Sequence, residues 1–124
     1  MTRVLIVEDH DDYRRVLTLY LSRLGYTVIQ ARDGLGGILQ AIRVQPRLII
    51  MDLMMPKMGG IEATARLKEN AITRDIPIIV CTAFRKEAYS HSKLVEYAAE
   101  IVEKPIELEK VQELVQKYLP PLKQ

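Results

Sequence analysis

The sequence predicts an α/β fold in which short parallel strands alternate with helices. Short apolar runs and segments of helical periodicity follow one another along the whole chain, a pattern typical of strand–helix units built around a parallel sheet. With 124 residues, 48% hydrophobic and 27% charged, the chain has the size and composition of one globular domain. We therefore expect a single domain spanning residues 1–124, organised around one open sheet.

Five strands are expected from the apolar runs. The first and third runs are the sequences VLIV and LIIM, which have the length and apolar character of short strands in strand–helix units. The predicted strands are residues 4–7, 27–31, 48–51, 77–81 and 101–103.

A helix is expected after each strand. The first helix, 13–24, has apolar residues at i, i+3, i+4, i+7, i+8 and i+11 from Tyr13 to Leu24 and ends before Gly25. The segment 86–98 has few large apolar residues in a regular pattern, so we expect a marginal, mobile helix there. The other predicted helices are residues 35–42, 61–70 and 108–118.

Four of the five predicted strands end in polar residues that can share one site. Glu8 and Asp9 follow the first strand, Asp52 the third, Thr82 the fourth and Lys104 the fifth. The carboxyl ends of parallel strands lie at one edge of the sheet, where open α/β sheets bind ligands. We therefore expect these side chains to converge.

This set of side chains suits the transfer of a phosphoryl group with the help of a divalent cation. A carboxylate can attack phosphorus and form an acyl phosphate, and Asp52 is the candidate nucleophile. Because Glu8, Asp9 and Asp52 would repel the phosphoryl oxygens, a cation is required, and Mg²⁺ suits carboxylates that leave room for water and phosphate. Lys104 would place an ammonium group against a phosphate oxygen, and Thr82 would offer a hydroxyl group.

Each of these signals has a simpler interpretation when it is taken alone. The acidic residues after the first strand are typical of a helix start, with Asp9, Asp11 or Asp12 as the N-cap. A lone Asp or Thr after a strand is often a turn residue, and Lys-Pro often marks a loop. The functional interpretation depends on the four signals occurring together, each after a different strand.

In these segments the sequence resembles the receiver domains of two-component response regulators. The matching segments are VLIVED (residues 4–9), DLMMPKMGG (52–60), Thr82-Ala83 and Lys104-Pro105. They follow the family's order and spacing over nearly the whole chain, and the segment 52–60 is the most specific. The resemblance implies a flavodoxin-like (βα)5 fold, a doubly wound five-stranded parallel sheet with strand order 2-1-3-4-5.

The resemblance also implies a function for the site. Asp52 would accept a phosphoryl group from a histidine kinase or a histidine phosphotransfer protein, and Thr82 and Lys104 would hold the phosphoryl oxygens. The Lys104-Pro105 peptide bond would be cis. The protein would be a phosphorylation-dependent signalling switch and not a conventional enzyme. The implied Mg²⁺ ligands are Asp9, Asp52, the backbone carbonyl of Met54 and, through water, Glu8.

Four positions bear on how such a switch would work. Ile101 stands where the family usually has Tyr or Phe, whose ring moves inward when the threonine closes on the phosphate; Phe84 and Tyr97 are the nearby aromatic alternatives. Met54 and Phe84 correspond to positions that flank the route of the hydrolytic water. Both are apolar and large, so we expect them to exclude water and slow the loss of the phosphoryl group.

The expected partners are proteins. We expect a downstream target, or a second copy of the chain, to bind the face formed by residues 86–118, from Lys86 to Tyr118, which includes Tyr89. A net charge of +2 is too small for direct nucleic-acid binding. No stretch approaches membrane-spanning length and the N-terminus is too short for a signal peptide, so we expect a cytoplasmic protein. Cys81, the only cysteine, is expected to be a buried strand residue.

Three other functions are compatible with parts of the sequence. An aspartate-dependent phosphatase would usually carry a second Asp two residues after its nucleophile, where this chain has Met54. A flavodoxin-like cofactor binder would need a phosphate-binding loop after the first strand, where the sequence EDHDD (8–12) would repel phosphate. The third is a receiver-like interaction module that phosphorylation does not control, and Ile101 is the residue that favours it.

Overall fold

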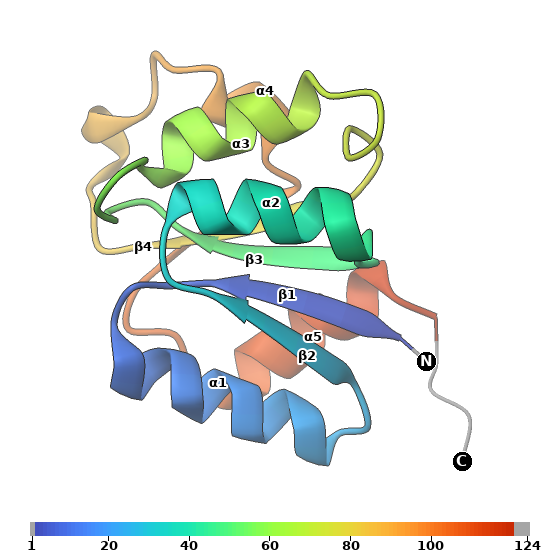
Figure 1. Ribbon diagram of the computed structural model, residues 1–124. Helices are drawn as coiled ribbons and strands as arrows, with labels where there is room; N and C mark the ends of the chain where they lie inside the picture. The colour runs from blue at the N-terminus through green and yellow to red at the C-terminus, as the bar shows by residue number, and fades with distance from the viewer. Residues whose placement is uncertain (1, 121–124) are drawn as a thin grey trace.

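The strands form one parallel sheet with the order β2-β1-β3-β4-β5 in the computed structural model, which describes residues 2–120 (Figure 1). The strands are β1 (Arg3–Val7), β2 (Thr27–Ala31), β3 (Leu48–Asp52), β4 (Ile78–Thr82) and β5 (Glu100–Glu103). This strand order confirms the predicted fold class. The predicted domain, 1–124, extends beyond the described residues at both ends.

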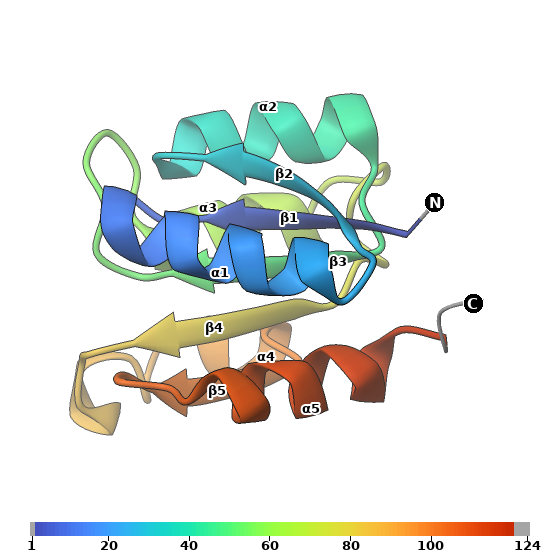
Figure 2. The same ribbon diagram turned by 90° about the horizontal axis from the view of Figure 1, so that it is seen from below.

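The helices cover both faces of the sheet. In Figures 1 and 2, α2, α3 and α4 lie on one face, and α1 and α5 lie on the other. The helices are α1 (Asp11–Arg23), α2 (Gly34–Val44), α3 (Gly60–Lys68), α4 (Leu94–Tyr97) and α5 (Leu108–Tyr118). Within residues 2–120, no helix is long and apolar enough to cross a membrane.

Two hydrophobic cores lie on opposite faces of the sheet, and alternate residues of each strand enter them. In β1, Leu5 and Val7 join the core under α2 and α3, whereas Val4 and Ile6 join the core under α1 and α5. All four are fully buried. Burial on both faces is the reason why the central strands β1, β3 and β4 are nearly continuous apolar runs, whereas the edge strands β2 and β5 carry polar residues. Cys81 is buried in β4, as predicted.

The strand register brings the ends of neighbouring strands together. Val7 pairs with Met51, Asp52 with Cys81, and Thr82 with Glu103. The residues that follow β1 and β5 therefore lie beside the last residues of β3 and β4. This arrangement builds the site.

The predicted helix over residues 86–98 is wrong. A 3₁₀ turn, η1 (Lys86–Ala88), and the four-residue α4 replace it. Between them the side chain of Ser92 donates to the carbonyl oxygen of Tyr89 (2.7 Å) and accepts from the backbone N–H of Leu94 (3.2 Å). Such side-chain bonds to the backbone compete with helical hydrogen bonds and interrupt the helix.

Candidate functional site

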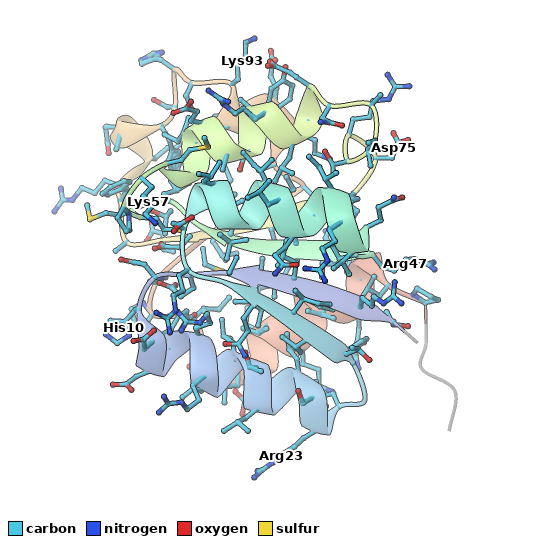
Figure 3. The ribbon with its side chains drawn as sticks, in the orientation of Figure 1. His10, Arg23, Arg47, Lys57, Asp75 and Lys93 are labelled. Carbon is cyan, nitrogen blue, oxygen red and sulfur yellow. The ribbon has the colours of Figure 1, made fainter. Side chains whose placement is uncertain are left out.

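The structure brings the predicted site residues to the carboxyl edge of the sheet. Glu8 and Asp9 follow β1, Asp52 and Thr82 end β3 and β4, and Lys104 follows β5. In Figure 3 this edge is the one that carries His10 and Lys57, opposite the edge with Arg47 and Asp75. All five residues line one cleft, together with His10, Tyr13, Met54 and Phe84.

Three carboxylates form an acidic cluster in the cleft. Glu8, Asp9 and Asp52 each offer an oxygen within 4.8 Å of the others. Glu8 and Asp52 are buried, whereas Asp9 is exposed. Carboxylate oxygens with one open side fit Mg²⁺, which keeps several waters and binds few protein carboxylates. The donor set therefore fits the predicted metal.

Lys104 supplies a positive charge to this cluster. Its Nζ lies 2.7 Å from Glu8 Oε1 and 3.2 Å from Asp52 Oδ1. Burial lowers the pKa of Lys104, but the hydrogen bond to Glu8 and the negative charges of Asp52 and Glu8 outweigh burial and raise that pKa above its ordinary value. The lysine is therefore cationic at neutral pH. The Lys104-Pro105 bond is cis, as predicted.

Asp52 is a carboxylate whose charge is disfavoured by its surroundings. Burial and the negative charge of Glu8 raise the pKa of Asp52, although Lys104 opposes the shift. One lysine does not neutralise two buried carboxylates and the neighbouring Asp9. A bound cation would favour the ionised, nucleophilic form of Asp52.

Thr82 lies beside Lys104 with its side chain buried. Thr82 is 1% exposed, and its Oγ1 accepts a hydrogen bond from the backbone N–H of Phe84 (2.9 Å). Its carbonyl oxygen accepts from the backbone N–H of Lys104 (2.8 Å). This backbone bond holds the hydroxyl-bearing and ammonium-bearing residues at adjacent strand ends, where both can reach a group on Asp52.

The loop after Asp52 packs tightly against the start of α3. The backbone N–H of Gly60 donates to the carbonyl oxygen of Leu53 (2.8 Å). A Cβ atom at Gly60 would lie 2.1 Å from the carbonyl oxygen of Asp52, so this position needs glycine.

The side chain of Met54 is largely exposed at the cleft. The metal-binding role of the Met54 carbonyl remains a prediction.

His10 and Arg14 organise the acidic turn, and neither role was predicted from the sequence. His10 is the N-cap of α1, because its Nδ1 accepts from the backbone N–H of Tyr13 (3.2 Å); the expectation of an Asp cap is wrong. The His10 backbone N–H donates to Glu8 Oε2 (3.1 Å). The buried Arg14 donates to the Glu8 carbonyl oxygen (2.7 Å). A signal for Arg14 was present, because it stands on the apolar face of α1 three and seven residues before Leu17 and Leu21.

The aromatic side chains expected on the face formed by residues 86–118 are not all free to contact a partner. Tyr89 is 7% exposed and belongs to the core, so its ring is not available as a contact residue. Tyr97, an alternative for the aromatic readout, donates its hydroxyl hydrogen to Glu69 Oε2 (2.9 Å), which also pairs with Lys93. Ile101 and Phe84 are half-buried and pack against the core on the α3 side.

Residues 4–116 match the family described as the response regulator receiver domain. The chain belongs to this family. A receiver domain is a phosphoacceptor signalling module rather than a conventional enzyme.

Two relatives illustrate the range of proteins that contain such a domain. The DNA-binding dual master transcriptional regulator RpaA of Synechocystis sp. is 40% identical over 83 residues, which are 67% of this chain and 34% of RpaA. Protein PilH of Pseudomonas aeruginosa is 32% identical over 109 residues, which are 88% of this chain and 90% of PilH. The chain thus spans about a third of one relative and most of the other.

Two similar crystal structures contain magnesium. The response regulator TrrA of Thermotoga maritima, in complex with Mg²⁺ and BeF, has a TM-score of 0.85 and 28% identity, covering 96% of this chain and all of that one. The receiver domain of the sensor histidine kinase PA1611 of Pseudomonas aeruginosa, with a magnesium ion in its active-site cleft, has a TM-score of 0.87 and 27% identity, covering 94% and 96%. The acidic cluster of this receiver domain resembles such Mg²⁺ sites.

Proposed function

We propose that this receiver domain is a phosphorylation-dependent switch in which Asp52 accepts a phosphoryl group from a histidine kinase or a histidine phosphotransfer protein. The observation that carries the proposal is the surroundings of Asp52. A buried carboxylate opens onto a cleft that also holds an ammonium group, a hydroxyl group and two further carboxylates. This set can bind a cation and a phosphoryl group at the same time.

The chemistry is a transfer between two nucleophiles. An oxygen of Asp52 forms a bond to phosphorus as the bond between phosphorus and the donor nitrogen breaks. Asp9 and Asp52, the Met54 carbonyl and, through water, Glu8 would hold Mg²⁺, which when bound neutralises the charge on the phosphoryl oxygens. Lys104 binds another of these oxygens and prevents repulsion between the phosphoryl group and the buried Glu8.

The phosphoryl group would change hydrogen bonds that exist in the resting protein. Lys104 must leave Asp52 Oδ1 to bind a phosphoryl oxygen, and the Thr82 hydroxyl must turn toward the same group. Thr82 is tied to Phe84, so its movement pulls on the segment that leads to η1 and α4. The face formed by residues 86–118 then changes, and a downstream protein or a second copy of the chain binds it.

One observation favours a second function, an interaction module that phosphorylation does not control. Ile101 pairs with Val80 in the sheet and packs against the core, so no aromatic ring at that position can exchange between exposed and buried positions. In that case Asp52 would accept a phosphoryl group without any change at residues 86–118.

Two measurements test the proposal and separate the alternatives. Incubation with phosphoramidate and Mg²⁺ should add one phosphoryl group by intact mass, and Asp52→Asn should abolish it; an unmodified wild type would refute the proposal. Beryllofluoride should then shift backbone amide resonances in residues 86–118, and Thr82→Ala should reduce those shifts. Phosphorylation without any shift in that segment would favour the uncontrolled module.

A further inference from the structure

Tyr13 connects the first helix to the cationic centre of the site. Lys104 Nζ lies 4.7 Å from the centroid of the Tyr13 ring, and the ring lines the same cleft as Asp52 and Thr82. The ring also packs against the core between α1, α5 and the sheet. That core fixes the position of the ring that faces the ammonium group.

Within the described range 2–120, the ammonium group has three contacts, of two different kinds. Two are ionic bonds, to Glu8 (2.7 Å) and Asp52 (3.2 Å). The third is the aromatic face of Tyr13, which attracts a cation through its quadrupole, more strongly where water is excluded. Lys104 is one-fifth exposed, so this contact is partly desolvated.

The ion pairs and the aromatic contact respond differently to Mg²⁺ binding and to the proposed phosphorylation of Asp52. When Asp52 and Glu8 turn their oxygens toward a metal or a metal-bound water, their bonds to Lys104 weaken, and phosphorylation removes negative charge from Asp52 itself. The Tyr13 ring offers no oxygen to a metal and undergoes no change. It is therefore the contact that persists through metal binding and phosphoryl transfer.

The hydroxyl group of Tyr13 takes no part in this contact. It is buried and has no hydrogen-bond partner among residues 2–120. Burial raises the pKa of Tyr13, and the nearby acidic groups reinforce the shift, so the phenol is neutral. The ring face, and not the hydroxyl, meets the ammonium group.

We propose that Tyr13 is a positioning residue whose aromatic face holds the Lys104 ammonium in the cleft while Glu8 and Asp52 bind the cation and the phosphoryl group. The kinetic half of this inference rests on the proposed function. The resting contact between ring and ammonium does not, so the two can be tested separately.

Three variants separate the ring face from its hydroxyl and from packing alone. Tyr13→Phe keeps the face and removes the unpaired hydroxyl. Tyr13→Leu keeps an apolar side chain and removes the aromatic face. If the leucine variant does not fold, Tyr13→Met replaces it, because the methionine side chain fills irregular spaces. Tyr20→Leu is the matched control, because Tyr20 lies on the same helix and its hydroxyl bonds Gln112 (2.8 Å), not the site.

The first readout is the rate of phosphorylation by phosphoramidate with Mg²⁺. The loss of a cation–π contact should slow Tyr13→Leu or Tyr13→Met by about threefold to thirtyfold, whereas Tyr13→Phe and Tyr20→Leu should stay within about twofold of the wild type. A folded leucine or methionine variant that reacts at the wild-type rate would overturn the proposal. An equal loss in Tyr13→Phe would also overturn it, because the hydroxyl would then be the active group.

The second readout does not depend on phosphorylation. The Lys104 side-chain protons nearest Nζ should show an upfield ring-current shift in the unphosphorylated wild type and in Tyr13→Phe, and this shift should disappear in Tyr13→Leu or Tyr13→Met. Its absence from the wild type would overturn the proposal even if Asp52 is phosphorylated. Its presence in a wild type that cannot be phosphorylated would support the contact while the proposed function fails.

Discussion

Replacing Asp52 by asparagine should stabilise the protein at neutral pH when no divalent cation is present. Asp52 is 8% exposed, and both its burial and the neighbouring carboxylate of Glu8 disfavour its charged form. Asparagine has nearly the same shape, can still accept a hydrogen bond from Lys104 through its amide oxygen, and carries no charge. The substitution that removes the proposed phosphoacceptor should therefore improve folding, as expected for a residue retained for function.

The magnitude follows from the distances in the site. With an effective dielectric constant of about 20, the attraction of Asp52 to Lys104 at 3.2 Å is about 5 kcal/mol, and the repulsion from a Glu8 oxygen within 4.8 Å is at least about 3.5 kcal/mol. The two interactions largely cancel. Burial of a carboxylate costs several kcal/mol, so Asp52→Asn should raise the free energy of unfolding by about 1–3 kcal/mol.

The effect should depend on pH in one direction. The pKa of Asp52 is raised in the folded state, by burial first and by Glu8 second. Below the unfolded value of about 3.9, Asp52 is protonated in both states and imposes no penalty. As the pH rises through the raised folded pKa, the wild type loses stability, and above it the loss is complete. The stability advantage of Asp52→Asn should therefore be larger at neutral pH and shrink on acidification.

Urea unfolding with EDTA, between about pH 5 and about pH 8, measures this difference. Glu113→Gln is the control, because it removes the same charge from a side chain that is 70% exposed and should change stability by less than about 0.5 kcal/mol. A lower stability of Asp52→Asn at neutral pH, or an advantage that grows as the pH falls, would show that the charge of Asp52 does not destabilise the fold.

Three further substitutions test other parts of the site. Asp9→Ala should remove most of the stabilisation by millimolar Mg²⁺ in thermal unfolding, because Asp9 is the exposed carboxylate of the cluster; an unchanged response would contradict the metal site. Gly60→Ala should lower the free energy of unfolding by about 1–3 kcal/mol or more, because its Cβ would lie 2.1 Å from the Asp52 carbonyl oxygen. Gly36→Ala in α2 is the control, because the nearest atom to its Cβ would be 3.3 Å away and its stability should not fall. Equal losses of stability in urea unfolding would refute this prediction. In the wild type the loss of the phosphoryl group should take minutes to hours, because Met54 and Phe84 line the cleft without a polar group to orient water. Met54→Asn should speed this loss. Decay within seconds in the wild type, or no acceleration in the variant, would show that these side chains do not control hydrolysis.

The fold and the strand-end residues were predictable because both depend on simple periodic features. Strands covered on both faces are continuous apolar runs, and parallel strands place their carboxyl ends together. Asp52, Thr82 and Lys104 could therefore be assigned to one edge before any contact was known. Their distances from one another, and the excess of carboxylates over ammonium, required the structure.

The parts that were missed depend on contacts between segments far apart in the sequence, or on single hydrogen bonds. Arg14 is buried because acceptors at Glu8, Asp11 and Gln30 surround it, and only the fold brings Gln30 to α1. The helix predicted over residues 86–98 is interrupted by one serine side chain. The prediction that Tyr13 lies on the apolar face of α1 is correct. Its ring also contacts Lys104, which is 91 positions further along the chain, and periodicity carries no signal for that contact.

The most direct test of the central claim is to locate the phosphoryl group on the chain. After phosphorylation with Mg²⁺, borohydride reduces an aspartyl phosphate to homoserine, and peptide mapping by mass spectrometry identifies the residue that has changed. Homoserine should form at position 52 alone, and none should form when Mg²⁺ or the phosphodonor is omitted. Homoserine at Asp9 or at another acidic residue, or phosphorylation without any reducible acyl phosphate, would contradict the central claim.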